Sequence, residues 1–210
     1  MSIRRLVVLA ASVGASACIL PMGGGGVHPD VAVPDSFLVR FETTRGGFNV
    51  MARTQWSPAG VDRFYQLVND RYYDETGFFR VVKGFVAQFG LAENPAKTKA
   101  WRVRRLADEP VKHGNTRGAI SYARGGPGTR TTQIYINLVD NTRNDSQGFS
   151  PMGRVVEGMS VVDSLYGGYG ENSGSGMRAG KQGPLLNGGN AYIDREFPKL
   201  DRLVRIRVDR

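Results

Sequence analysis

The sequence has 210 residues, a formal net charge of +9 and 40% hydrophobic residues, which predicts one globular domain with a complete core and disfavours a disordered chain. Its 28 glycines and 10 prolines favour many turns and short strands over a helical bundle. Lysine and arginine are spread along the chain and do not alternate with aromatic side chains, so we expect no nucleic-acid partner despite the basic charge.

The first 17 residues have the pattern of an export signal. Two arginines precede an apolar run of 15 residues from Leu6 to Leu20, shorter than a membrane-spanning helix, and Ala15–Ala17 supplies the small residues of a cleavage site. Cys18 is the single cysteine, so we expect no disulfide within the chain. Its position also fits a bacterial lipoprotein signal. Ordinary cleavage after residue 17 and membrane attachment through a lipid on Cys18 therefore both remain open.

Residues 18–35 are rich in glycine and proline and lack an apolar period, so they predict a flexible tether. The folded domain is expected over residues 36–210. It begins with strand-like alternation at 37–44 and at 48–52, and the glycine turn between the two runs predicts a hairpin.

Ser57 as an N-cap and Pro58 at the first helical position predict a helix that reaches about Asp70, with apolar residues recurring on one face. Further short strands are expected at 77–82, 85–89, 119–123, 133–138, 154–156 and 203–208, and a second helix at 160–166. Many short strands with two helices favour a mainly β fold, a barrel capped by helices.

Histidine is too scarce for several kinds of catalytic centre. The two histidines are His28, in the tether, and His113, beside a glycine. They disfavour a histidine metal site and a Ser-His or Cys-His catalytic centre. No Walker loop, Gly-x-Ser-x-Gly or Gly-x-Gly-x-x-Gly motif occurs. We expect an enzyme that needs no metal, no cofactor and no covalent intermediate.

A compact aromatic run with one arginine and one glutamine occupies residues 77–90, with the sequence GFFRVVKGFVAQFG. It resembles the signature of the cyclophilins. The resemblance continues in order at 118–124, 126–127, 132–138 and 153–159, and covers about residues 37–209. It implies a closed eight-stranded antiparallel β-barrel capped by two helices, and peptidyl-prolyl cis/trans isomerase activity on proline-containing polypeptides, with a monomer as the default state.

The resemblance also implies site residues. The catalytic group would be Arg80, which offers fixed, permanently charged donors, with Gln88 ordering it and Phe85 beside it. The positions that match substrate-binding ones are Val86, Ala123, Arg124, Gln133, Tyr135 and Phe149. Ala123 and Arg124 match a strand edge that binds largely through its backbone, so the arginine in place of the usual asparagine need not abolish binding.

Three positions depart from the best-known members of the family. Phe149 stands in place of a histidine, Arg143 is the nearest equivalent of a tryptophan, and Asn144 replaces a leucine. We therefore expect weak sensitivity to cyclosporin. The segments 167–171 and 187–197 resemble exported bacterial cyclophilins, which agrees with the export signal and predicts the periplasm or cell envelope.

Two other functions remain open. The altered positions permit a peptide-binding module or chaperone that keeps the groove and has little catalytic activity, although Arg80 and Gln88 favour the enzyme. The charge alone permits a binder of nucleic acid or an anionic envelope polymer, which the scattered arrangement of the basic residues disfavours.

Overall fold

The computed structural model describes residues 32–174 and 182–209. The predicted export signal over residues 1–17, most of the predicted tether and Cys18 lie outside the described residues. No helix within the described ranges is long and apolar enough to cross a membrane.

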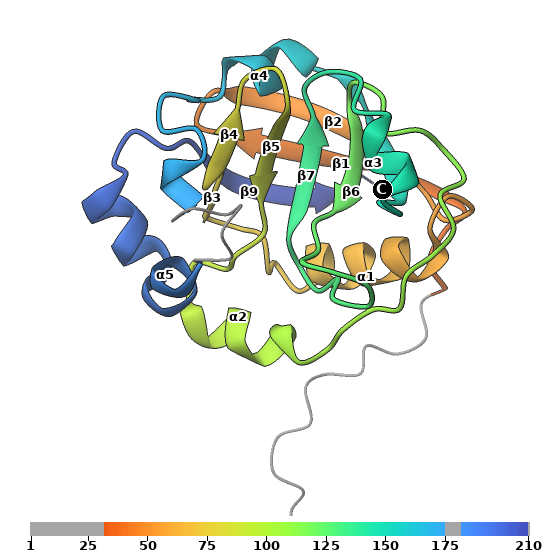
Figure 1. Cartoon of the computed structure of the whole chain (residues 1–210), viewed down its shortest axis with the longest axis horizontal. Coiled ribbons are helices and arrows are strands. Elements are labelled where there is room, and N and C mark those ends of the chain that lie inside the picture. Colours follow the sequence, from red (N-terminus) through yellow and green to blue (C-terminus); the bar gives the residue numbers. More distant parts are fainter. Residues whose placement is uncertain (1–31, 175–181, 210) are drawn as a thin grey trace, which may run out of the picture. The chain divides into compact units, whose positions relative to one another are not determined.

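Nine strands of the described chain form one antiparallel sheet, in the order β3-β9-β1-β2-β8-β6-β7-β5-β4 (Figure 1). They are β1 (Ser36–Thr43), β2 (Gly46–Arg53), β3 (Thr76–Gly77), β4 (Arg80–Val82), β5 (Val86–Phe89), β6 (Ala119–Tyr122), β7 (Ile134–Asn137), β8 (Pro151–Glu157) and β9 (Arg202–Val208). The predicted hairpin is confirmed, with β1 and β2 paired from Ser36–Arg53 to Thr43–Gly46.

The expected closed eight-stranded barrel is wrong. The predicted strand over 77–82 is divided at Phe78 and Phe79, so that β3 pairs with β9 and β4 pairs with β5. β3 and β4 are the two end strands of the order, and no ladder joins them among the described residues, so the sheet does not close on itself. The sheet is a strongly curled half-barrel with two free ends.

The first helix, α1 (Pro58–Asn69), confirms the sequence prediction and buries Val61, Phe64, Leu67 and Val68 against the sheet. Its cap differs from the prediction, because the Ser57 side chain makes no capping hydrogen bond to the helix. The Glu109 carboxylate accepts hydrogen bonds from the backbone N–H groups of Ala59 (2.8 Å) and Gly60 (3.2 Å) and from the Ser57 hydroxyl. A distant carboxylate therefore satisfies the free N–H groups of the first turn.

The described residues contain more helices than the two expected. The second predicted helix is α4 (Met159–Ser164), and the additional ones are α2 (Pro95–Arg102), α3 (Arg143–Ser146) and α5 (Gly183–Glu196). In α2 the one buried side chain is Thr98, so the sequence has no apolar periodicity that would predict this helix. In α5 Gly189 has a φ of 54° inside the helix, and a Cβ there would lie 2.4 Å from the Glu93 carbonyl oxygen. The kink at Gly189 breaks the helical period of α5.

Two hydrophobic clusters hold these elements together. The larger one fills the concave side of the sheet and includes Phe41, Phe48 and Phe89. The smaller one joins Phe79 and Leu91 to Leu185, Ile193 and Leu200 of the C-terminal part of the chain. The C-terminal segment is therefore packed directly beside the start of β4, where the candidate site begins.

Candidate active site

One row of polar side chains crosses four neighbouring strands. Arg80 on β4 is opposite Gln88 on β5, Gln88 is opposite Tyr135 on β7, and Tyr135 is opposite Ser121 on β6. Directly opposed residues share a face of the sheet. Because side chains alternate along a strand, the neighbouring residues Val81, Ala87, Ile120 and Ile136 face the larger core cluster.

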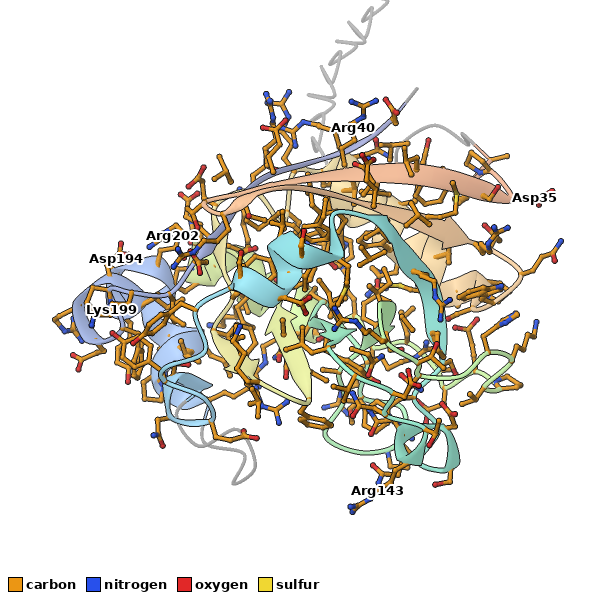
Figure 2. The ribbon with its side chains drawn as sticks, turned by 90° about the horizontal axis from the view of Figure 1, so that it is seen from above. Asp35, Arg40, Arg143, Asp194, Lys199 and Arg202 are labelled. Atoms are coloured by element: carbon orange, nitrogen blue, oxygen red, sulfur yellow. The ribbon has the colours of Figure 1, made fainter. Side chains whose placement is uncertain are left out.

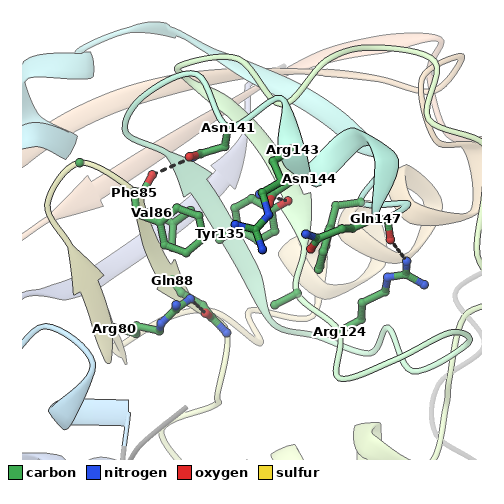
Figure 3. A pocket seen from close by; sticks show the side chains of 13 residues that line it. Arg80, Phe85, Val86, Gln88, Arg124, Tyr135, Asn141, Arg143, Asn144 and Gln147 are labelled. Carbon is green, nitrogen blue, oxygen red and sulfur yellow. Dashed lines mark hydrogen bonds between the residues drawn. The ribbon is translucent and has the colours of Figure 1, made fainter. Parts of the chain in front are cut away.

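A cavity of about 760 Å³ lies on this face (Figure 3). Eight of the nine predicted side chains line it: Arg80, Phe85, Val86, Gln88, Ala123, Arg124, Tyr135 and Phe149. Gln133 is not among the lining residues. The lining also includes Gly84, Asn141 and Gln147, for which no role was predicted, and Arg143 and Asn144, which were singled out as departures from the family pattern. The structure thus brings the predicted residues together, while their roles stay predictions.

The guanidinium of Arg80 is fixed by two partners. Its Nε and one terminal nitrogen donate to the two carboxylate oxygens of Glu171, each at 2.8 Å, and the other terminal nitrogen donates to Gln88 Oε1 at 3.0 Å. Its carbon lies 5.3 Å from the centroid of the Phe85 ring. A guanidinium has five N–H groups, and these three bonds leave two for a substrate. Glu171 was not predicted.

A chain of hydrogen-bonded side-chain amides holds Gln88 in place. Gln88 is 1% exposed, and its Nε2 donates to Gln133 Oε1 at 2.9 Å. Gln133 Nε2 in turn donates to Gln182 Oε1 at 2.9 Å. Gln133 therefore contacts the site through Gln88 and lies outside the cavity lining, which differs from the predicted place in the substrate-binding surface.

The apolar wall of the cavity consists of Phe85, Val86, Tyr135 and Phe149. Val86 and Tyr135 are nearly fully buried, and the rings of Tyr135 and Phe149 meet edge to face with centroids 5.8 Å apart. Asn141 Nδ2 donates to the Phe85 carbonyl oxygen at 2.9 Å, which holds the loop that carries this ring. Fixed aromatic walls suit a small apolar ring such as that of proline.

Asn115, which was also not predicted, organises the floor of the cavity and is fully buried. Its Oδ1 accepts hydrogen bonds from the hydroxyls of Tyr135 at 2.8 Å and Ser121 at 3.0 Å, and its Nδ2 donates to Asp145 Oδ1 and to the Phe149 carbonyl, both at 2.7 Å. Burial raises the pKa of the Tyr135 phenol, so this hydroxyl keeps its proton and remains a donor.

The Arg124 side chain is held at the other end of the cavity. It forms an ion pair with Asp108 at 2.7 Å, donates to the Gln147 carbonyl oxygen and lies over the Phe149 ring, 5.2 Å from its centroid. Its side chain is only 11% exposed. Arg124 therefore links the strand edge that carries Ala123 to the loop that carries Phe149.

These contacts describe what the site can do chemically. It offers a fixed cation with unused donors beside an apolar pocket, and no nucleophile with an adjacent base. Within the described ranges, no group of three or more histidine, cysteine, aspartate or glutamate side chains could hold a metal ion.

The curled sheet, with an arginine beside an apolar pocket, defines a protein of the cyclophilin class. Residues 38–179 match the family model described as cyclophilin type peptidyl-prolyl cis-trans isomerase/CLD. The chain is similar to peptidyl-prolyl cis-trans isomerase A of Dickeya dadantii, with 34% identity over 144 residues that cover 65% of this chain and 75% of that protein. It is also 34% identical over 140 residues to peptidyl-prolyl cis-trans isomerase B of Escherichia coli, covering 62% of this chain and 84% of that protein.

A solved structure of a cyclophilin type peptidyl-prolyl cis-trans isomerase from Cryptosporidium parvum has a similar fold, with a TM-score of 0.58 and 19% identity. The match covers 83% of this chain and 98% of that one. The chain belongs to the family of cyclophilin-type peptidyl-prolyl cis-trans isomerases. Its activity is cis/trans isomerisation of peptidyl-prolyl bonds.

Proposed function

We propose that this isomerase acts on X-Pro bonds of exported or unfolded polypeptides and thereby assists their folding in the periplasm or at the cell envelope. The observation that carries the assignment of the site is the guanidinium of Arg80, which is held beside the apolar pocket with two donors unused. The export pattern in residues 1–17 and the resemblance of segments 167–171 and 187–197 to exported bacterial relatives support the location.

The chemistry follows from the electronic structure of the amide. Delocalisation of the nitrogen lone pair into the carbonyl produces a rotation barrier of roughly 18–20 kcal/mol, and uncatalysed X-Pro isomerisation takes tens to hundreds of seconds. Twisting the bond localises the lone pair on the prolyl nitrogen. A hydrogen bond from Arg80 to that nitrogen is stronger in the twisted state than in either planar state, which is the differential binding that accelerates a reaction.

The apolar wall would hold the proline ring while the rest of the peptide rotates. Phe85, Val86 and Tyr135 are the members of that wall assigned to the ring, and Gln88 lies between Arg80 and Tyr135 across the sheet. Burial of the ring fixes the prolyl nitrogen relative to the guanidinium, which lowers the entropic cost of reaching the transition state. A second crystal structure of the Cryptosporidium parvum protein, with a TM-score of 0.56, was determined in the presence of the dipeptide Ala-Pro.

The test is the rate of isomerisation of a proline tetrapeptide, followed by NMR exchange. Arg80→Ala should lower kcat/KM by about a hundredfold, which is typical for loss of one preorganised donor in a transition state. Arg80→Lys is the matched control, because it keeps the charge and loses the planar donor geometry, and it should also be impaired. A variant without Arg80 that is as active as the wild type would refute the assignment.

The second candidate function is a peptide-binding module or chaperone, and the changed residues Arg143, Asn144 and Phe149 at the cavity favour it. The same cavity then binds unfolded chains without isomerising them efficiently. Suppression of aggregation of a reduced, unfolded client separates the two functions. Equal suppression by the wild type and Arg80→Ala, with slow isomerisation by both, would favour the chaperone.

The location and anchorage have a direct test. Mass spectrometry of the mature protein isolated from its host measures the mass of the first residue. Cleavage after residue 17 with an acylated Cys18 would identify a lipid-anchored protein, and an unmodified new N-terminus would identify a soluble exported form. A full-length chain that begins at Met1 would contradict export. Light scattering of the purified protein tests the proposed monomer.

A further inference from the structure

The cavity is lined by three cationic side chains and by no carboxylate. Arg80, Arg124 and Arg143 belong to its lining, and none of the lining residues is an aspartate or glutamate. Figure 3 shows the three arginines surrounding the same hollow from different elements, with Arg143 on α3. The electrostatic field that a bound peptide experiences depends on which of these positive charges are already paired with a carboxylate.

Two of the three charges have carboxylate partners behind the lining. Arg80 pairs with both oxygens of Glu171, and Arg124 pairs with Asp108 at 2.7 Å. The side chains of both arginines are 11% exposed, so these pairs are largely shielded from water. Their charges are therefore balanced locally before any substrate arrives.

Arg143 differs from the other two in having no such partner. Its side chain is exposed and forms no ion pair or hydrogen bond with any residue that the structure describes. The carboxylate of its own helix, Asp145, is engaged by the backbone N–H and the side chain of Asn115, at 2.8 and 2.7 Å. Figure 2 shows Arg143 projecting outward from the ribbon. One uncompensated positive charge thus remains at the rim of the cavity.

We propose that Arg143 is a specificity-determining residue that selects substrates with a carboxylate, from aspartate or glutamate, close to the isomerised X-Pro bond. This inference rests on the proposed assignment of the cavity as the substrate site. A peptide carboxylate reaching Arg143 gains an ion pair without breaking an existing one, because the guanidinium has no partner to give up. A lysine at the same substrate position meets an uncompensated like charge. Arg143 acts through binding and orientation, and the bond rotation itself remains the task of Arg80.

The experiment measures kcat/KM by NMR exchange for a set of proline peptides. Each peptide carries Glu, Gln or Lys at one position, either the residue that precedes the X-Pro pair or the residue that follows it. Gln is the uncharged match for Glu. At one or more positions the wild type should prefer Glu over Gln by roughly two- to fivefold, the size of an exposed ion pair. The preference should disappear toward 1 M salt, where the screening length falls to about 3 Å.

Variants assign the preference to this side chain. Arg143→Ala should abolish it and Arg143→Glu should reverse it in favour of Lys. The matched control is Arg53→Glu, which makes the same change of net charge at an exposed residue outside the cavity, and it should leave the preference intact. Equal rates for Glu and Gln at every position, or a reversal as large in Arg53→Glu as in Arg143→Glu, would overturn the proposal.

A parallel NMR titration of the same peptides keeps this inference separate from the proposed function. The wild type could show no turnover and still bind Glu peptides more tightly than Gln peptides, with that difference lost in Arg143→Ala. This outcome would refute the enzyme assignment of the site and support the role of Arg143. Turnover without any preference for Glu in rate or affinity would refute the role of Arg143 and leave the enzyme assignment standing.

Discussion

Removal of the Glu171 carboxylate should slow isomerisation by weakening the hold on Arg80. The side chains of Arg80 and Glu171 are 11% and 27% exposed, and the pair is bidentate. Exposed ion pairs contribute about 0.2–1 kcal/mol, whereas breaking a buried pair costs about 3–5 kcal/mol. A pair of intermediate exposure should contribute about 1–2 kcal/mol to the productive orientation, which corresponds to about a 5- to 30-fold loss of kcat/KM in Glu171→Ala. Glu171→Gln keeps one carbonyl acceptor and should lose less.

A double-mutant cycle distinguishes positioning of Arg80 from a general effect on the fold. If Glu171 acts through Arg80, adding Glu171→Ala to Arg80→Ala should cause no further loss of kcat/KM. Glu42→Ala is the matched control, because it removes a bidentate pair with Arg205, on β1 and β9, whose residues do not line the cavity. A kcat/KM of Glu171→Ala equal to that of the wild type would refute the reasoning. So would a double variant whose loss of kcat/KM is the sum of the two single losses in free energy.

Three further predictions concern the floor of the cavity, the buried tyrosines and the rim of the cavity. Asn115→Ala should lower the free energy of unfolding by about 2–4 kcal/mol in urea denaturation, because it leaves buried partners such as the Tyr135 hydroxyl unsatisfied; a loss below about 1 kcal/mol would contradict this. Burial raises the pKa of four tyrosines above the ordinary value near 10, namely Tyr72, Tyr73, Tyr122 and Tyr135. The folded state then keeps protons that the unfolded state releases, so stability should fall as pH rises above about 10, and the phenolate absorbance of these four should develop only with unfolding. Cyclosporin should inhibit weakly because Arg143 and Phe149 alter the rim, and a sub-micromolar inhibition constant would contradict that expectation.

The sequence predicted those parts of the fold whose signals are local. The helix α1 has a proline at its start and an apolar face, and the β1–β2 hairpin has alternation around a glycine turn. The family resemblance located Arg80, Gln88 and the aromatic wall because these residues fall within one short segment and its neighbours in the sheet.

The unpredicted residues of the site act over long distances in the sequence. Glu171 lies 91 positions from Arg80, and Asn115 contacts Tyr135 and Phe149 from 20 and 34 positions away. A carboxylate in a glycine-rich segment and an asparagine in a loop have many ordinary explanations when the chain is read alone. Only the pairing of the strands shows which side chains they reach.

The division of the predicted strand at 77–82 explains both the open sheet and the support of Arg80. Phe78 and Phe79 are both fully buried although they are adjacent, because Phe78 belongs to the larger core cluster and Phe79 to the smaller one. Adjacent strand residues point to opposite faces, so Phe78 and Phe79 enter two different cores, and the buried–exposed alternation of a strand with one solvated face is absent here. Local pattern cannot reveal this, since it depends on the C-terminal segment that forms the second core.

That second core also connects the C-terminal segment to the face of the sheet that carries the candidate site. The Ser173 hydroxyl donates to the Phe79 carbonyl at 2.7 Å, two residues from the Glu171 carboxylate that holds Arg80. Phe79 itself packs with Leu185 of α5. The backbone that carries Arg80 and the carboxylate that orients it are therefore fixed by the same short region. We infer that the C-terminal segment is part of the site, because Glu171 pairs with Arg80 and Ser173 binds the carbonyl of the residue before it.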